Sequence, residues 1–219
     1  MRKSVLLIFI CLTGSLLNII FNLFFIYHAG IPLYLDTIFT IAVTLSCGLV
    51  WGVICGAFSN IISCIIWFSN GWGGFLFALC SAATAFITWL FMRLFPRELN
   101  LAGAAQTIPQ GLYRSSQLSK VMDKMIVLIL LSFALCLAMS VMGGFIAAFL
   151  LSLPSSHSDG AVISSAFSNT MFDRNFPVLL SEIFSRIPMN IIDRLISAFS
   201  GYGIALGFRS LLKSFSLRP

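Results

Sequence analysis

From Met125 to Leu151 the chain reads MIVLILLSFALCLAMSVMGGFIAAFLL, a stretch that contains no charged residue. A helix needs about 20 apolar residues to cross the roughly 30 Å hydrocarbon core of a bilayer. This stretch exceeds that length, so it predicts a transmembrane helix over residues 121–151. Several other parts of the chain have the same character.

The composition of the whole chain indicates an integral membrane protein. Hydrophobic residues make up 59% of the 219 positions and charged residues only 9%, whereas soluble domains carry roughly 25% charged residues. A chain so poor in charge could not keep its surface hydrated. Apolar spans use up its length, which leaves no room for an ATPase, kinase or nucleic-acid-binding domain.

Apolar stretches predict six spans, which form a single all-α transmembrane domain over residues 1–219. The approximate spans are 4–27, 32–49, 51–68, 73–94, 121–151 and 188–212. Residues 95–120 are expected to form a polar cytoplasmic loop and residues 152–176 a Ser-rich external loop.

A short interfacial helix is expected over residues 177–187. Pro188 would then open the last span, because the first turn of a helix tolerates a missing N–H. Within the interfacial helix Glu182 and Arg186 stand four residues apart and could pair.

The distribution of cations predicts that both termini are cytoplasmic. This orientation places ten cations inside, namely Arg2, Lys3, Arg93, Arg97, Arg114, Lys120, Lys124, Arg209, Lys213 and Arg218. It leaves three outside or within the last helix, namely Arg174, Arg186 and Arg194. Cytoplasmic loops carry the excess of Lys and Arg, so we expect a six-helix bundle with the N- and C-termini inside, in the inner or plasma membrane.

Several classes of function are disfavoured by what the chain lacks. The six cysteines lie in apolar segments without a CxxC pair, and both histidines lie in predicted loops. The sequence has no HExxH motif, P-loop or Ser–His pair at membrane depth, so we expect no catalytic residues, metal or cofactor. The net charge of +6 fits basic residues at helix ends, so nucleic-acid binding is not expected.

Polar side chains at membrane depth are the starting point for a functional site, because each is costly unless partnered. At 1.5 Å per residue, Asp36 lies about 6 Å below the outer end of the second span. Asp193 and Arg194 lie roughly 7–9 Å below Pro188. The candidate substrate-binding residues that converge in the outer half are Asn22, Asp36, Asn60, Trp67, Asn190, Asp193 and Arg194.

Two interpretations of these residues stay open. One is a structural ion pair, Asp36 or Asp193 with Arg194, that holds helices together. The other is a pocket, open to the outside, that recognises a polar solute. Small residues at helical spacing, such as Gly52 with Gly56 and Gly203 with Gly207, are more typical of close helix packing than of a binding site.

Three stretches resemble the substrate-capture S components of energy-coupling factor transporters. They are PLYLDTI at residues 32–38, SNII at residues 59–62 and RIPMNIIDR at residues 186–194. Between the first two stand Gly48, Gly52 and Gly56. The six-span plan, the length and the basic character agree with that family.

The resemblance implies a six-helix bundle that binds a vitamin-like solute near its outer face. A transmembrane coupling protein, which would meet the cytoplasmic half of the first helix, and two cytoplasmic ATPases would drive its release inward. Where the family often has alanines one turn apart on the first helix, this chain has Cys11 and Ser15. It also lacks the N-terminal histidine arrangement of the metal-specific relatives, which disfavours nickel or cobalt.

Two other functions remain as alternatives. One is a ligand-sensing or partner-binding membrane module that transports nothing. The other is a purely structural membrane subunit, which would have a packed outer half with no cavity.

The predicted orientation can be tested with reporters fused after Pro219. Because the cations are expected to stay on the cytoplasmic side, a green fluorescent protein fusion should fluoresce and an alkaline phosphatase fusion should be inactive. The opposite pair of results would reverse the orientation.

Overall fold

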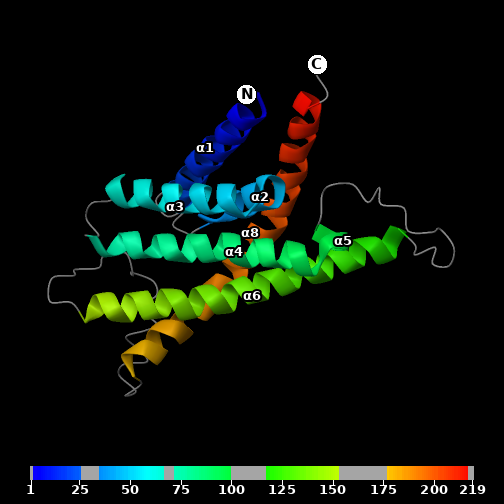
Figure 1. The fold of residues 1–219 in the computed structure, drawn as a ribbon. Coiled ribbons are helices and arrows are strands. Elements are labelled where there is room, and N and C mark those ends of the chain that lie inside the picture. Colours follow the sequence, from blue (N-terminus) through cyan, green and yellow to red (C-terminus); the bar gives the residue numbers. More distant parts are fainter. Residues whose placement is uncertain (1, 26–34, 67–71, 100–116, 153–176, 217–219) are drawn as a thin grey trace.

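Every regular element in the described part of the chain is a helix (Figure 1). The computed structural model describes residues 2–25, 35–66, 72–99, 117–152 and 177–216. The helices are α1 (Arg2–Leu23), α2 (Ile38–Cys47), α3 (Leu49–Ile66), η3 (Trp72–Phe77), α4 (Ala78–Leu94), α5 (Pro96–Leu99), α6 (Gln117–Leu151) and α8 (Val178–Ser216). The predicted all-α class is therefore confirmed for this part.

Five helical stretches are long and apolar enough to cross a membrane. They are Ser4–Leu23, Leu49–Ile66, Gly74–Leu94, Val121–Leu151 and Val178–Ser214. The chain is thus a multi-pass membrane protein with spans close to five of the six predicted ones.

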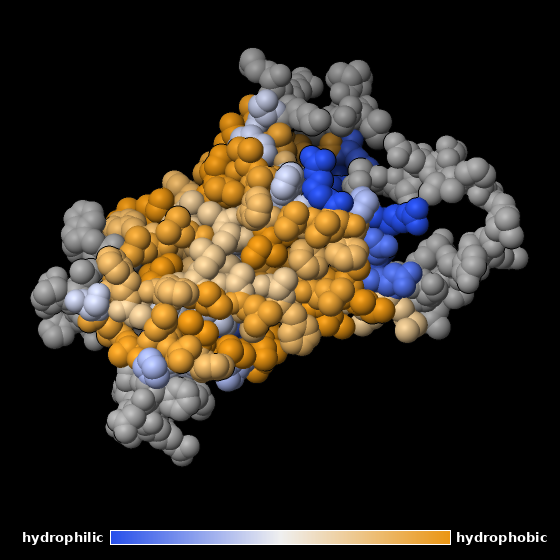
Figure 2. Space-filling model, turned by 60° about the horizontal axis from the view of Figure 1, so that its bottom comes forward, coloured by the Kyte–Doolittle hydropathy of each residue, from blue (hydrophilic) through white to orange (hydrophobic). Residues whose placement is uncertain are grey.

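The surface of these helices is largely apolar, as expected where lipid replaces water. Figure 2 shows a broad hydrophobic face, with strongly hydrophilic residues gathered at the end where α4 ends and α6 begins. On α1 the exposed apolar side chains recur at helical spacing, namely Val5, Phe9, Leu12, Leu16 and Ile20. This stripe is the lipid-facing side of the helix.

The second predicted span differs most from the structure. Instead of a helix over residues 32–49, α2 covers only ten residues, a rise of about 15 Å or half the hydrocarbon core. Leu35 has a positive φ of 41° and precedes a turn at Asp36 and Thr37, so the helix starts at Ile38. Residues 32–34 lie outside the described part.

Although short, α2 is the centre of the bundle. It packs against α1, α3, α4 and α8, and its residues from Ile38 to Leu45 are all buried. Gly48, with φ of 98°, ends α2 and lets the chain reverse at once into α3, as only a residue without Cβ does readily. A buried half-span of this kind needs partners for its backbone at both ends.

Close packing of α3 on α2 depends on glycine, as the sequence pattern predicts. A Cβ at Gly52 would collide with the Thr44 hydroxyl and lie 2.9 Å from the Thr44 Cβ. At Gly56 a Cβ would lie 2.9 Å from Ser81 Cβ of α4. The prediction is wrong for Gly203 and Gly207, where a Cβ would meet nothing within 4 Å.

The last helix corrects the prediction of a separate interfacial helix. Residues 178–187 continue through Pro188 into one helix of 39 residues, which changes direction in Figure 1. Proline removes one backbone hydrogen bond, but in membranes neighbouring helices support such breaks. The carbonyl that loses its partner here is that of Phe184, four residues before Pro188, and close to this point Cys136 Sγ of α6 donates to the Ile187 carbonyl at 3.8 Å. The predicted Glu182–Arg186 pair is confirmed, with 3.4 Å between Arg186 Nη2 and Glu182 Oε2.

The two expected loops are described only at their edges. The stretch after α4 is not wholly loop, because Pro96–Leu99 form a helical turn that buries Leu99, and α6 already begins at Gln117. Residues 100–116 and 153–176 lie outside the described part. The ends of α1 and α8 that lie near the termini pack together, with Phe208 and Leu212 of α8 near Ile10 of α1.

The glycine contacts predict opposite effects for two alanine substitutions. Gly52→Ala should destabilise the fold by about 1–3 kcal/mol through overpacking against Thr44, seen as a lower melting temperature in detergent. Gly203→Ala is the matched control and should be neutral or slightly stabilising, because alanine is the better helix former. Equal melting temperatures for the two variants would contradict the close α2–α3 packing.

Candidate functional site

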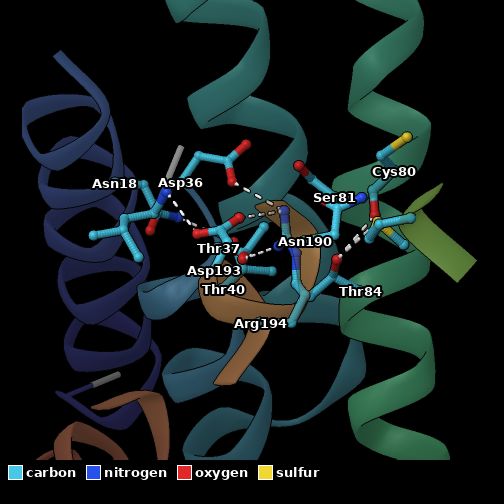
Figure 3. A network of polar contacts seen from close by, with 12 residues as sticks. Asn18, Asp36, Thr37, Thr40, Cys80, Ser81, Thr84, Asn190, Asp193 and Arg194 are labelled. Atoms are coloured by element: carbon cyan, nitrogen blue, oxygen red, sulfur yellow. Dashed lines mark hydrogen bonds and ion pairs between the residues drawn. The ribbon is translucent and has the colours of Figure 1, made fainter. Parts of the chain in front are cut away.

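Three charged residues meet where α2 begins, and we call Asp36, Asp193 and Arg194 the charged cluster (Figure 3). Asp193 and Arg194 are consecutive on α8, and Asp36 lies in the turn before α2. Arg194 Nη2 lies 3.0 Å from Asp193 Oδ2 and 3.7 Å from Asp36 Oδ1. The sequence placed these three residues at similar depth, and the structure brings them into contact.

The charged cluster also holds the start of α2. The Leu35 backbone N–H donates to Asp193 Oδ1 at 3.0 Å, and the Arg194 guanidinium donates to the Thr37 hydroxyl. Backbone N–H groups at a helix start have no partner within the helix, and in a membrane they have no water either. Two side chains of α8 therefore fix the turn that shortens α2.

A third polar side chain reaches the same turn from α1. Asn18 Oδ1 accepts from the Phe39 backbone N–H at 3.0 Å, and Asn18 Nδ2 donates to Thr40 Oγ1 at 3.0 Å. Asn18 is fully buried. Asn18 thus acts as a helix cap supplied by another helix, a role usually taken by a residue of the same chain segment.

Both ends of α2 are held in this way. At the other end Arg209 Nη2 of α8 donates to the Leu45 carbonyl at 2.9 Å, one of the last carbonyls of α2 that lack a partner within the helix. A cation at this end also complements the partial negative charge of the helix C-terminus. The half-span is therefore fixed to α8 at its start and at its end.

The hydrogen bonds of the charged cluster are incomplete. Within the described residues, four buried side-chain atoms of this region have no hydrogen-bond partner, namely Asp36 Oδ1, Asp193 Oδ2, Arg194 Nε and Ser197 Oγ. The two carboxylate oxygens lie within ion-pair distance of Arg194, but the length or the angles of each contact are not those of a hydrogen bond. A buried polar atom left in this state costs about 1–3 kcal/mol, or more if it is charged, and the contact with Arg194 offsets part of this cost for the two carboxylate oxygens.

The predicted amides lie around the charged cluster rather than in it. Asn190 Nδ2 donates to Ser140 Oγ of α6 at 2.9 Å. Asn60 Nδ2 donates to the Ser81 hydroxyl of α4. Asn22 is half-buried on α1, one turn beyond Asn18. Trp67 lies outside the described part of the chain.

Five partners of this network were not among the candidates from the sequence: Asn18, Thr37, Thr40, Ser81 and Ser140. A signal existed on α6, where the buried residues Ser132, Cys136 and Ser140 recur every four residues. That spacing places them on one face of the helix, within a span that otherwise seems uniformly apolar.

The chemistry available to this site is recognition by charge and hydrogen bonds. Among the described residues no three His, Cys, Asp or Glu side chains are grouped so that they could hold a metal ion. A shallow hollow between α6 and α8, too small to hold a water molecule, is lined by Ser132, Phe133, Cys136, Ile191 and Leu195. This hollow contains no member of the charged cluster and is mostly apolar.

Comparison with protein-family models, curated proteins and solved structures finds no match for this chain.

Removal of the one cation from the charged cluster should destabilise the fold strongly. Arg194→Met leaves the buried carboxylate of Asp193 and the partly exposed carboxylate of Asp36 without their counter-charge, which should cost about 3–5 kcal/mol and lower the melting temperature in detergent. The matched control is Arg97→Met on the exposed face of α5, where the change should stay within about 0.5 kcal/mol.

A double variant tests whether charge balance is the cause. Asp193→Asn combined with Arg194→Met removes one charge of each sign, and should regain part of the stability that Arg194→Met loses. If the double variant loses as much stability as the separate losses of Asp193→Asn and Arg194→Met added together, the two residues act independently.

Proposed function

We propose that this chain is the substrate-capture subunit of an energy-coupling-factor-type uptake transporter. It would bind a small, vitamin-like solute from the outer face of the inner or plasma membrane. The observation that carries the proposal is the charged cluster, whose buried atoms keep unused hydrogen-bonding capacity at the start of a half-span. Ionisable residues inside a membrane bundle generally mark a path or site for a polar solute.

The architecture around the charged cluster supports this function. Membrane transporters commonly form solute sites where helices are interrupted near mid-membrane, with helix ends directed at the solute. The ten-residue α2 is an interrupted span of this kind, and its start adjoins the charged cluster. We propose that α2 together with the residues before it forms the sixth crossing of an N-in, C-in bundle.

Each candidate residue has a role in this proposal. Asp36, the most exposed of the three charged residues, would contact the solute directly, and the buried Asp193 and Arg194 would complete the binding site behind it. The amides and the aromatic residue would surround it, namely Asn22, Asn60, Trp67 and Asn190. No covalent chemistry is involved, so the chain is not an enzyme.

Energy for uptake would come from partner chains. A transmembrane coupling protein would meet the cytoplasmic half of α1, and two cytoplasmic ATPases would act through it. The apolar side chains exposed along α1, such as Val5 and Phe9, provide a surface that lipid or another membrane helix can cover. Purification of the chain together with such ATPases would support this coupling.

The alternative is a ligand-sensing or partner-binding module that transports nothing. One observation favours it: the members of the charged cluster already bind one another and hold α2, so the cluster also serves a structural purpose. A sensor would bind the same ligand without any ATP-dependent uptake. Uptake of the ligand by vesicles that contain the chain and its partners separates the two functions.

Ligand binding is the first test of the proposal. A panel of vitamins and nucleobases is screened by the melting temperature of the detergent-purified chain. A true ligand at 100 times its Kd should stabilise the fold by about 2.7 kcal/mol.

The same screen on variants locates the site. Each variant is compared with its own ligand-free melting temperature, so that lost stability is not mistaken for lost binding. Asp193→Ala and Arg194→Ala should lose the ligand-induced rise, whereas Arg97→Ala should keep it. If both cluster variants fold and retain the full rise, the proposed site is wrong.

A further inference from the structure

The charge of the charged cluster indicates what kind of solute it takes. We infer that the solute binds through a positively charged group, such as an ammonium or amidinium, that pairs with the carboxylate of Asp36. This inference rests on the proposed function and names the class of substrate for the same site. Ammonium and amidinium groups share one positive charge and N–H groups that donate hydrogen bonds.

The first argument is the balance of charge. Two carboxylates, Asp36 and Asp193, face one guanidinium, that of Arg194. The start of α2 adds the partial positive charge of a helix N-terminus, about half an elementary charge. With both carboxylates ionised the sum is negative, and an unbalanced charge is expensive in a low-dielectric interior, so either a proton on Asp36 or a bound cation would relieve it.

Neighbouring ion pairs do not remove this imbalance. The other described acid and base on the same stretch of α8, Glu182 and Arg186, lie 3.4 Å apart and pair with each other. That pair is neutral as a unit. Among the described residues, Arg194 is therefore the one cation that pairs with Asp36.

The second argument is that Asp36 is the accessible member. Its side chain is 27% exposed, whereas those of Asp193 and Arg194 are 1% and 6% exposed. Figure 3 shows Asp36 at the edge of the network, with one carboxylate oxygen turned to Arg194 and the other turned away. At 3.7 Å its contact with Arg194 is longer than a hydrogen bond, so the carboxylate can accept a donor.

The third argument is that Arg194 is already engaged. Its Nη1 donates to the Thr37 hydroxyl, and its Nη2 lies 3.0 Å from Asp193 Oδ2. An anionic solute would have to compete with Asp193 for this buried guanidinium. A cationic solute leaves these contacts intact and completes the pairing of Asp36.

The experiment compares cationic and anionic probes on the full chain in detergent. The cationic probes are pyridoxamine, whose ammonium group donates hydrogen bonds, and choline and thiamine, whose charged nitrogens have no N–H and so test the charge alone. The anionic probes are nicotinate, pantothenate and biotin, and all probes are used at equal concentration. A separate arm exchanges sodium chloride for potassium chloride at constant ionic strength, because a sodium ion could supply the same charge. The readout is the melting temperature, followed by titration of each hit.

Asp36 is then varied with a matched control. Asp36→Asn should weaken the cationic hit at least about tenfold, because the buried charge pair loses one partner, whereas Asp36→Glu should keep the preference for cations. Asp123→Asn, on the exposed inner end of α6, should leave binding unchanged. Helical content and monodispersity of each variant confirm that it folds.

Each outcome decides the inference. A cationic hit that depends on Asp36 supports it, and a sodium effect with the same dependence assigns the charge to a co-bound ion instead of the solute. Anionic hits alone, or a cationic hit that Asp36→Asn retains, overturn the inference while solute capture stands. No stabilisation by any probe or ion, with the chain folded, counts against both the inference and the proposed function.

Discussion

A backbone N–H inside a bilayer has no water to bind, and this constraint governs the structure around α2. The helix begins within the bundle, at Ile38, because the chain turns at Asp36 and Thr37. Its first N–H groups therefore need partners from elsewhere. The Phe39 N–H, in the first turn of α2, finds its partner in Asn18 of α1, and the Leu35 N–H, in the turn before the helix, finds its partner in Asp193 of α8. Three helices are therefore tied together at one helix start.

The same arrangement explains why charges are retained at this depth. A capping oxygen on a neutral side chain would satisfy the Leu35 N–H, but a carboxylate there requires Arg194 as its counter-charge. The guanidinium in turn lies between two carboxylates and leaves Asp36 only loosely paired. The hydrogen bond from the Leu35 N–H to Asp193 is structural, and it leaves Asp36 as a charged group at the edge of the network. The structural ion pair and the proposed solute site therefore involve the same residues.

The membrane class and most of the spans could be predicted from the sequence, because each depends on a local property. A stretch of about 20 apolar residues forms a spanning helix whatever its neighbours, and five helical stretches of 18 residues or more have this character in the structure. The contact between Asp36 and Arg194 could also be predicted from the sequence, because charges at membrane depth generally pair. Thr37 and Ser140 were not foreseen as partners, since a lone hydroxyl in an apolar run gives no sign of what it will bind.

Where helices begin and end was decided by tertiary contacts. The apolar residues before and after Asp36 form one continuous pattern, but Asp193, 157 positions after Asp36, supplies the bond that stabilises a turn there. Pro188 suggested the start of a helix, yet the helix continues through it, and α6 packs along α8. The sequence by itself determined that the chain crosses the membrane and which residues are too polar to lie there alone. Only the tertiary structure decided which of them meet, because hydrogen bonds between distant segments depend on how the helices pack and not on the pattern along any one of them.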